Sequence, residues 1–500
     1  MNLSENNIKL IFGLKLKQLR QEKGLTLSEL AERSSLSVSY LNEIENGKKQ
    51  PKPKKIAAIA KALDVPYDKL VSLKLNKNLA PISELLESNF LEKLPLDHYG
   101  IDVHKLLIQL SQAPIQLSAL VSTLIEVAKS LELTENQFSN IAIRTYKELN
   151  ENYFSELEDS VLKFCKKIKF DYNPPVTYNR LLEILTNNFN YEVDENSIPD
   201  TPDFSNIRAV SVINGKRKKI LINRKLADSQ KAFIIGKEIA YVFLKISDRS
   251  NLYSNIPLDS FDQLLNNLKA SYFSTALIIN KQSIINDISF LFNQKKFDEK
   301  FLLSLIKKYD VSPDMLLQRI TNVLTKYFNI SNFFFLRINS AKNSGVYSVT
   351  KQIRLNIKDY PSEYQNNEHY CRRWLSIDIL KRLEELQKTN EDFKLPIAAI
   401  QKSVFGDSNN VYIEISIAKF SSLHPNFNYS VTLGFLLNEE LKQKILFVNN
   451  QSIPERVVNG TCQRCNILDC KERAAKPTIY ETKRQLEKLK KELNKIVQES

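Results

Sequence analysis

Residues 24–47 read GLTLSELAERSSLSVSYLNEIENG, and this stretch decides the fold of the N-terminal part of the chain. Its apolar residues recur every three or four positions, which predicts two short amphipathic helices joined by a tight turn. Thr26, followed three residues later by Glu29, is a capping-box pattern that begins the first helix. Ser37 can cap the second helix, and Asn46-Gly47 supplies a residue that tolerates the left-handed conformation ending it. Such a pair predicts a helix-turn-helix, whose second helix normally lies in the DNA major groove.

Helix-forming stretches on both sides complete a five-helix DNA-binding domain over residues 8–75. Residues 1–75 hold 14 Lys and Arg against 8 Asp and Glu, and five of the lysines follow the second helix of the pair. Lysines in that loop would contact phosphates and hold the domain in register. The residues predicted to bind DNA are Ser28, Ser37, Ser39, Tyr40, Asn42, Lys48 and Lys49. The alternative is a solvated basic loop on an unrelated helical bundle.

The pattern GLT..ELAE, S.SYLN.IENGK and the following Pro resembles the XRE/Cro repressor family across residues 8–73. The resemblance implies sequence-specific binding to double-stranded DNA. Leu27 stands where the family usually has Gln, Glu43 replaces a basic residue, and Val38 replaces a common polar base reader. The operator sequence therefore does not follow from the family.

Length and composition limit the number of domains, the kind of partner and the compartment that we expect. A chain of 500 residues predicts roughly three or four domains. The net charge of +14 favours a polyanionic partner, and no apolar run reaches membrane-spanning length. The N-terminus lacks the pattern of a signal peptide, and five cysteines do not form an extracellular disulfide framework. We therefore expect a multidomain protein of the reducing cytoplasm, without a membrane partner.

Residues 76–168 are predicted to be wholly helical, as a connector, a dimerisation bundle or part of a sensor. The segment DYNPP at 171–175 then opens a mixed pattern. A helix over 178–189 is followed by strand-like runs at 207–213 and 219–222, and the turn Asn214-Gly215 between them predicts a hairpin.

The arrangement over residues 171–300 resembles the ImmA/IrrE metallopeptidase domain, in which a hairpin precedes a helix bearing HExxH and a second ligand helix. Lys237 and Tyr241 stand at the two histidine positions, Asn267 stands at the carboxylate position, and only Glu238, the general base, is retained. Without metal ligands a zinc-activated water is not available. We expect a degenerate, catalytically silent pseudo-peptidase, either with a retained pocket or as a plain core helix. An active zinc metallopeptidase is the disfavoured alternative.

Residues 310–478 are predicted to form an α+β sensor domain. Stretches 332–338, 411–417, 429–437 and 444–448 have strand composition, which indicates an antiparallel sheet with flanking helices. SPDMLLQRITNVL, FFFLRINSAKNSG, HYCRRWL, YSVTLGFLL and CQRCNILDCKERAAKP follow in an order similar to the bacterial short-chain fatty acyl transcriptional regulators. That resemblance implies regulation by a short-chain fatty acyl compound such as an acyl-CoA, and no enzyme activity.

Arg372, Arg373 and Trp374 combine positive charge with apolar surface, which suits an acyl carboxylate or phosphate effector. In the family a Pro usually precedes this Trp. The alternative interpretation is an exposed basic turn beside a core tryptophan.

Cys462, Cys465 and Cys470 have C-x2-C-x4-C spacing, which fits three ligands of a structural zinc or an iron–sulfur cluster. Cys371, His369 or His424 would supply the fourth ligand, and a metal or redox sensor is the alternative function. The opposing interpretation is that an Asp469–Arg473 ion pair orders the loop while the thiols merely pack.

The C-terminal helix over residues 479–500 carries apolar residues at heptad spacing, which makes it either a dimer clasp or a helix docked on its own domain. These residues are Leu486, Leu489, Leu493 and Ile496. We expect a homodimer, because single helix-turn-helix heads usually read paired half-sites.

Overall fold

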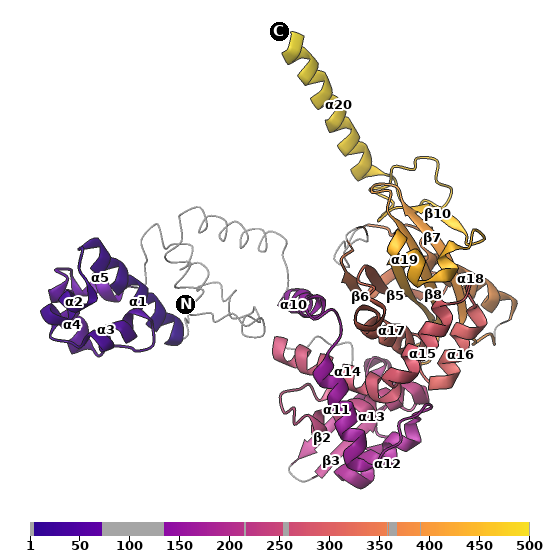
Figure 1. Cartoon of the computed structure of the whole chain (residues 1–500), viewed down its shortest axis with the longest axis horizontal. Helices are drawn as coiled ribbons and strands as arrows, with labels where there is room; N and C mark the ends of the chain where they lie inside the picture. Colours follow the sequence, from indigo (N-terminus) through magenta and orange to yellow (C-terminus); the bar gives the residue numbers. More distant parts are fainter. Residues whose placement is uncertain are drawn as a thin grey trace. The chain divides into compact units, whose positions relative to one another are not determined.

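The computed structural model describes residues 5–72, 135–214, 217–253, 260–357, 359, 368–390 and 392–499 (Figure 1). Contacts divide the chain into two compact units. The N-terminal unit holds Met1–Tyr146 with Leu258–Leu264, and the C-terminal unit holds Lys147–Pro257 with Leu265–Ser500. Each unit is described by itself.

Five short helices form the DNA-reading head, as the sequence predicts. They are α1 (Glu5–Glu22), α2 (Leu27–Ser34), α3 (Val38–Glu45), α4 (Pro53–Ala62) and α5 (Tyr67–Val71). The predicted capping box is present: the Thr26 hydroxyl accepts from the Glu29 amide at 3.2 Å, and the Glu29 carboxylate accepts from the Thr26 amide at 2.7 Å. Leu30, Leu41 and Ile59 are fully buried in the shared core.

Close packing of α1 on the end of α3 fixes the angle of the helix-turn-helix. A Cβ added at Gly13 would lie 2.3 Å from the carbonyl oxygen of Ile44, so only glycine allows this approach. Arg20 of α1 forms a buried, bidentate pair with Glu45 of α3, at 2.6 and 2.9 Å. The last turn of α3 is thus held by shape and by charge.

The predicted connector lies partly outside the described residues, because nothing is described between 72 and 135. Its remainder is helical, as α10 (Glu135–Leu149) and α11 (Ser155–Ile168). The domain boundaries at 75, 168, 300 and 478 stay predictions.

The first part of the C-terminal unit is built on a four-stranded sheet. Its strands are β1 (Tyr191–Asp194), β2 (Ala209–Asn214), β3 (Arg217–Ile222) and β4 (Leu252–Tyr253), in the order β1-β3-β2-β4. The predicted hairpin is confirmed, since β2 and β3 pair antiparallel from Ala209–Ile222 to Asn214–Arg217. The surrounding helices are α12 (Tyr178–Phe189), η2 (Pro202–Phe204), α13 (Asp228–Phe243), α14 (Phe261–Ile278) and α15 (Lys281–Phe292).

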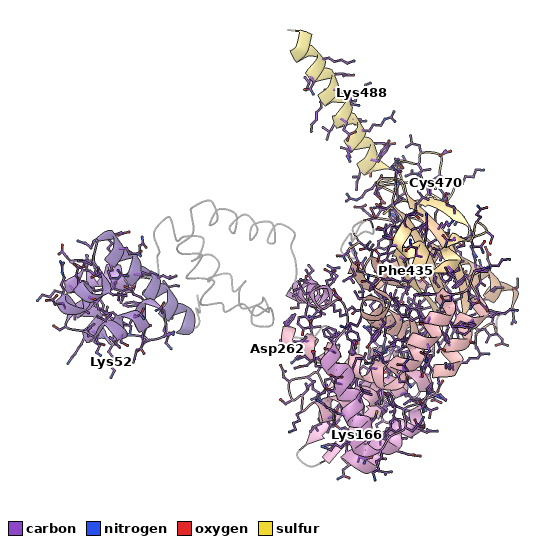
Figure 2. All side chains as sticks on the ribbon, viewed as in Figure 1. Lys52, Lys166, Asp262, Phe435, Cys470 and Lys488 are labelled. Carbon is purple, nitrogen blue, oxygen red and sulfur yellow. The ribbon has the colours of Figure 1, made fainter. Side chains whose placement is uncertain are left out.

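A six-stranded sheet forms the second part, with the order β10-β7-β8-β9-β5-β6. Its strands are β5 (Phe333–Ala341), β6 (Tyr347–Leu355), β7 (Ile397–Phe405), β8 (Val411–Phe420), β9 (Phe427–Leu436) and β10 (Glu455–Val458). Helices α16 (Glu299–Tyr309), α17 (Pro313–Phe328) and α18 (Leu375–Thr389) pack on it. Phe334 packs in the same core as α18, and Phe435 meets Phe292 of α15 edge to face, so side chains from both faces are buried (Figure 2).

One predicted strand is wrong. Residues 444–448 lie in α19 (Glu439–Lys444) and the 3₁₀ helix η3 (Leu446–Asn449). Asn438 caps α19 by accepting from the Leu441 amide at 2.8 Å, so the chain turns into a helix directly after β9. The segment has the alternating apolar residues typical of a strand because Ile445 and Phe447 are both fully buried.

The chain ends in α20 (Thr478–Glu499), which projects from the second sheet (Figure 1). Leu486, Leu489 and Leu493 are 54%, 52% and 50% exposed, so the helix does not dock this stripe on its own domain. Across the described ranges, none of the helices combines the length and apolarity needed to cross a bilayer.

Candidate functional sites

Most of the residues predicted to bind DNA are exposed in the head, and Tyr40 is half-buried. Ser28 lies on α2, Ser39 and Asn42 lie on α3, and all three are exposed. Ser37 is also exposed, but its hydroxyl caps α3 by accepting from the Tyr40 amide at 3.2 Å. Ser39 and Asn42 are therefore the polar side chains of this helix that are best placed to meet base edges.

Tyr40 has a partly structural role that the sequence did not indicate. Its ring packs on the helical core and lies under two ammonium groups, Lys55 at 4.1 Å and Lys49 at 5.3 Å from the ring centre. Lys49 also pairs with Glu43 at 3.1 Å. These contacts keep the basic loop close to α3.

Five exposed lysines follow α3, and two of them, Lys49 and Lys55, make the contacts just described. The other three are Lys48, Lys52 and Lys54, and Figure 2 labels Lys52 at the surface of the head. A row of exposed ammonium groups beside a recognition helix is suited to the phosphates that flank a major groove.

Lys237 and Asn267, which the sequence resemblance aligns with metal-ligand positions, are in contact. Lys237 of α13 and Asn267 of α14 are thirty residues apart, yet the Lys237 ammonium donates to the Asn267 side-chain oxygen at 2.5 Å. The ammonium also lies 4.8 Å from the centre of the Tyr253 ring. Burial lowers the pKa of Lys237 to about 7, and nearby Arg249 adds to the effect. Tyr241 lies against the Arg249 guanidinium, 4.4 Å from its ring centre.

Glu238 is fully buried and fully engaged. Its carboxylate accepts from the Tyr253 hydroxyl, from the Tyr191 hydroxyl at 3.1 Å, and from Arg249 at 2.9 Å. A general base must reach the proton that it removes. This carboxylate instead serves as the hub of a structural hydrogen-bond network.

The predicted effector residues lie at the start of α18. Trp374 is buried, stacks on Tyr370 at 5.3 Å, and donates its indole N–H to the Asn459 carbonyl at 2.9 Å. Arg372 lies 4.4 Å from the centre of the Tyr347 ring, and Arg373 is half-buried. The tryptophan is thus a core residue, whereas both arginines are partly exposed.

The structure brings Cys371 beside Cys462 and Cys465. The Cys371 amide donates to the Gly460 carbonyl at 3.2 Å, and the three thiols are buried. Burial raises the pKa of Cys371 to about 11, with the neighbouring thiols adding to it. Cys470 is less buried and lies on the loop before α20 (Figure 2). Among residues that the structure describes, no three His, Cys, Asp or Glu side chains form a group suited to a metal ion.

The proposed fourth ligands differ in position. His369 reaches the cysteine loop, because its carbonyl accepts from the Cys462 amide at 2.7 Å. His424 lies in the β8–β9 turn, whereas the cysteine loop borders the β7–β8 turn through Gly406. These turns are at opposite ends of the ten-residue strand β8, which spans about 30 Å.

The ion pair that the sequence offered as an alternative is not formed within the described chain. Arg473 donates instead to the backbone carbonyls of Cys462 at 2.7 Å, Cys465 at 3.3 Å and Ile467. A guanidinium has five donors in a fixed fork, so it can hold several carbonyls of one loop. The loop is therefore ordered by backbone contacts, which sequence spacing does not reveal.

Comparison with known proteins finds relatives of the N-terminal head. The helix-turn-helix family matches residues 16–70. The transcriptional repressor RghR of Bacillus subtilis (strain 168) is 44% identical over 61 residues, 12% of this chain and 45% of that protein. The transcriptional regulator ClgR of Mycobacterium tuberculosis (strain ATCC 25618 / H37Rv) is 38% identical over 56 residues, 11% of this chain and 50% of that protein.

A shorter protein is covered more completely. The uncharacterised HTH-type transcriptional regulator y4dJ of Sinorhizobium fredii (strain NBRC 101917 / NGR234) is 37% identical over 62 residues, 12% of this chain and 80% of that protein. A solved Mycobacterium tuberculosis transcriptional regulator aligns with 67% of this chain and 92% of its own, at a TM-score of 0.47 and 15% identity. The chain spans about half the length of RghR and ClgR. Through its N-terminal head, the chain belongs to the XRE-type helix-turn-helix family of transcriptional regulators.

Proposed function

We propose that the protein is a sequence-specific DNA-binding regulator of transcription whose C-terminal unit responds to a metabolite, a short-chain fatty acyl compound such as an acyl-CoA. It acts as a cytoplasmic homodimer without enzyme activity. The observation that carries the DNA-binding part is the capped α2–α3 pair, with Ser39 and Asn42 exposed beside the lysine-rich loop. An amide and a hydroxyl can read base edges, while ammonium groups bind phosphates without reading sequence.

The absence of catalysis is supported by the pseudo-peptidase centre. Lys237 and Asn267 stand at positions where the resembling enzymes have metal ligands, and they hydrogen-bond each other. The Glu238 carboxylate accepts hydrogen bonds from Arg249 and two tyrosines. Lysine and asparagine are not among the usual protein ligands of Zn²⁺, which are Cys, His, Asp and Glu. In this proposal the peptidase-like part survives as a scaffold for the sensor.

The deciding experiment is DNA binding by the purified full chain to its own upstream region, at fixed salt, with and without short acyl-CoAs. Specific binding that changes at least about fivefold with one acyl-CoA supports the proposal, since allosteric couplings are typically this large or larger. An Asn42→Ala protein serves as the control for specificity. Specific binding that no acyl-CoA changes contradicts the fatty acyl effector while leaving the DNA-binding function in place.

The metal or redox sensor stays the alternative prediction, and the same assay separates it. A chelator or hydrogen peroxide would then change DNA affinity, and acyl-CoAs would not. The buried thiols with the raised pKa of Cys371 favour a structural role, because reactivity requires an accessible thiolate.

A further inference from the structure

Basic side chains from separate elements of the C-terminal unit gather between its two sheets. Arg208 directly precedes β2, Lys237 lies on α13, and Arg337 and Lys351 are register partners on β5 and β6. The two parts are joined here by a hydrogen bond from Ser422 to Gln230 at 2.9 Å. The positive charges are close enough that Arg208 and Lys351 both lower the pKa of Lys237.

Asp314 is the carboxylate at the centre of this group. One of its oxygens, Oδ2, lies 3.5 Å from the Lys351 ammonium and 3.7 Å from the Arg337 guanidinium. The other, Oδ1, is buried and has no hydrogen-bond partner. Arg337 also stacks on the Tyr429 ring at 4.5 Å, and Lys351 donates to Gln318 at 2.5 Å. Two cations thus share one carboxylate through long contacts.

The Arg208 guanidinium also faces the Asp314 carboxylate, so one carboxylate serves three cations. Within the described residues, the Arg208 guanidinium forms no hydrogen bond or ion pair, and the Lys237 ammonium bonds only the neutral Asn267 amide. Glu238, the other carboxylate near Lys237, is already paired with Arg249. Excess charge of one sign is costly away from bulk water unless a counter-charge joins it.

The cluster is partly accessible to solvent. Lys351, Arg337 and Asp314 keep 34%, 21% and 17% of their side-chain surface accessible. Burial nevertheless lowers the pKa of both Lys351 and Arg208, so these groups are partly shielded from water. Perturbed titratable groups in such a position are frequent at binding sites.

We propose that Arg208, Lys237, Arg337 and Lys351 bind the carboxylate or phosphate group of a small anionic ligand, which supplies the missing counter-charge between the two sheets. The guanidinium forks of Arg208 and Arg337 can each form paired hydrogen bonds to such an oxyanion. The inference rests on the proposed metabolite response and names its site. That site is separate from Arg372 and Arg373 at the start of α18.

The test is thermal unfolding of the full chain in acetate or inorganic phosphate, at constant ionic strength set with sodium chloride. One or both anions should raise the Tm by about 3 °C at roughly ten times Kd. Arg208→Gln and Lys351→Met should each weaken binding at least about tenfold. Arg208→Gln should not lower the Tm without anion, because it relieves repulsion, whereas Lys351→Met also removes a partner of the buried Asp314 carboxylate and should lower the Tm. Arg224→Gln, at a 63% exposed arginine that follows β3, is the matched control and should bind like the wild type.

Stabilisation by phosphate alone assigns a phosphate group, and stabilisation by acetate alone assigns a carboxylate. The proposal is overturned if neither anion stabilises the wild type beyond chloride, or if folded Arg208→Gln and Lys351→Met proteins bind as the wild type does. Far-UV circular dichroism checks folding. The readout does not involve DNA, so loss of the DNA response with intact anion binding would contradict the proposed function and not this site.

Discussion

Asn42 and Lys48 are both exposed at the end of the helix-turn-helix, and their chemistry assigns them different tasks. A carboxamide can form two hydrogen bonds with an adenine edge, so Asn42→Ala should reduce discrimination between cognate and scrambled DNA by about 1–3 kcal/mol. An ammonium meets phosphate, so Lys48→Ala should weaken binding to both DNAs alike and lower the salt slope by about one. Titrations at several salt concentrations measure both effects.

Each of these two substitutions serves as the control for the other. If Asn42→Ala weakened both DNAs equally, Asn42 would be a backbone contact and not a base reader. If Lys48→Ala changed the preference between the two DNAs, Lys48 would help to read the base sequence and would not be a pure phosphate contact.

Lys237 makes stability depend on pH. Burial lowers its pKa in the folded protein to about 7, below the value of about 10.4 expected in the unfolded chain. The unfolded state therefore binds more protons between these values, and the folded state gains stability as pH rises. From pH 7 to 9, the free energy of unfolding of the wild type relative to Lys237→Met should rise by up to about 1.4 kcal/mol per pH unit. Urea unfolding at each pH measures it.

Lys163, an exposed residue of α11, provides the reference. The difference between the wild type and a Lys163→Met protein should stay flat over the same range. An equally flat difference for Lys237→Met would mean that Lys237 stays charged when folded, with a counter-charge beside it.

At the scale of elements, the crossing of α13 and α14 brings Lys237 to Asn267. A Cβ added at Gly236 would lie 2.3 Å from the Ser274 hydroxyl oxygen and 3.1 Å from its Cβ. Gly236→Ala should therefore push the helices apart and destabilise the C-terminal unit by about 1–3 kcal/mol. Chemical denaturation measures the loss.

A double-mutant cycle isolates this contact. Ser274→Ala removes the oxygen that clashes, so the double variant should be more stable than the sum of the two single losses predicts. Strict additivity would show that Gly236→Ala acts through helix geometry away from Ser274.

Elements with strong local signals were predictable. The helices of the head and the β2–β3 hairpin follow from caps, periodicity and a turn. Strand β7 was missed because Gln401 and Ser403 occupy buried positions and hydrogen-bond each other at 2.8 Å, which breaks the apolar alternation. Strand β6 lies at the sheet edge and has few buried residues, so it lacks the same signal.

Sites were predictable only where their residues are close in sequence. The exposed side chains of α3 lie within eight residues of one another, so the periodicity of the sequence was enough to predict their exposure. The family resemblance singled out Lys237 and Asn267 as positions of one site. The hydrogen bond between them depends on the crossing of α13 and α14, which the sequence does not show. The cluster around Asp314 combines segments more than one hundred residues apart, and no pattern along the chain links Arg208 to Lys351.

At the scale of the whole molecule, reading two half-sites requires two heads, and the residues that the structure describes contain one. Helix α20 presents Leu486, Leu489 and Leu493 at heptad spacing and leaves each about half exposed. Lysines such as Lys488 project elsewhere along the helix (Figure 2). An apolar stripe on a projecting, charged helix is the pattern of a two-stranded coiled coil.

We therefore expect that α20 pairs with α20 of a second copy. Replacing Leu486, Leu489 and Leu493 by Gln should convert the dimer to a monomer in sedimentation velocity. Affinity for DNA with two half-sites should fall by about a hundredfold, and affinity for a single half-site should not change, because only the linkage between heads is lost. Lys488→Gln with Lys491→Gln changes the same helix off the stripe and should leave both properties intact. A leucine variant that stays dimeric would place dimerisation outside α20, and the stripe would then have to serve a partner other than a second copy.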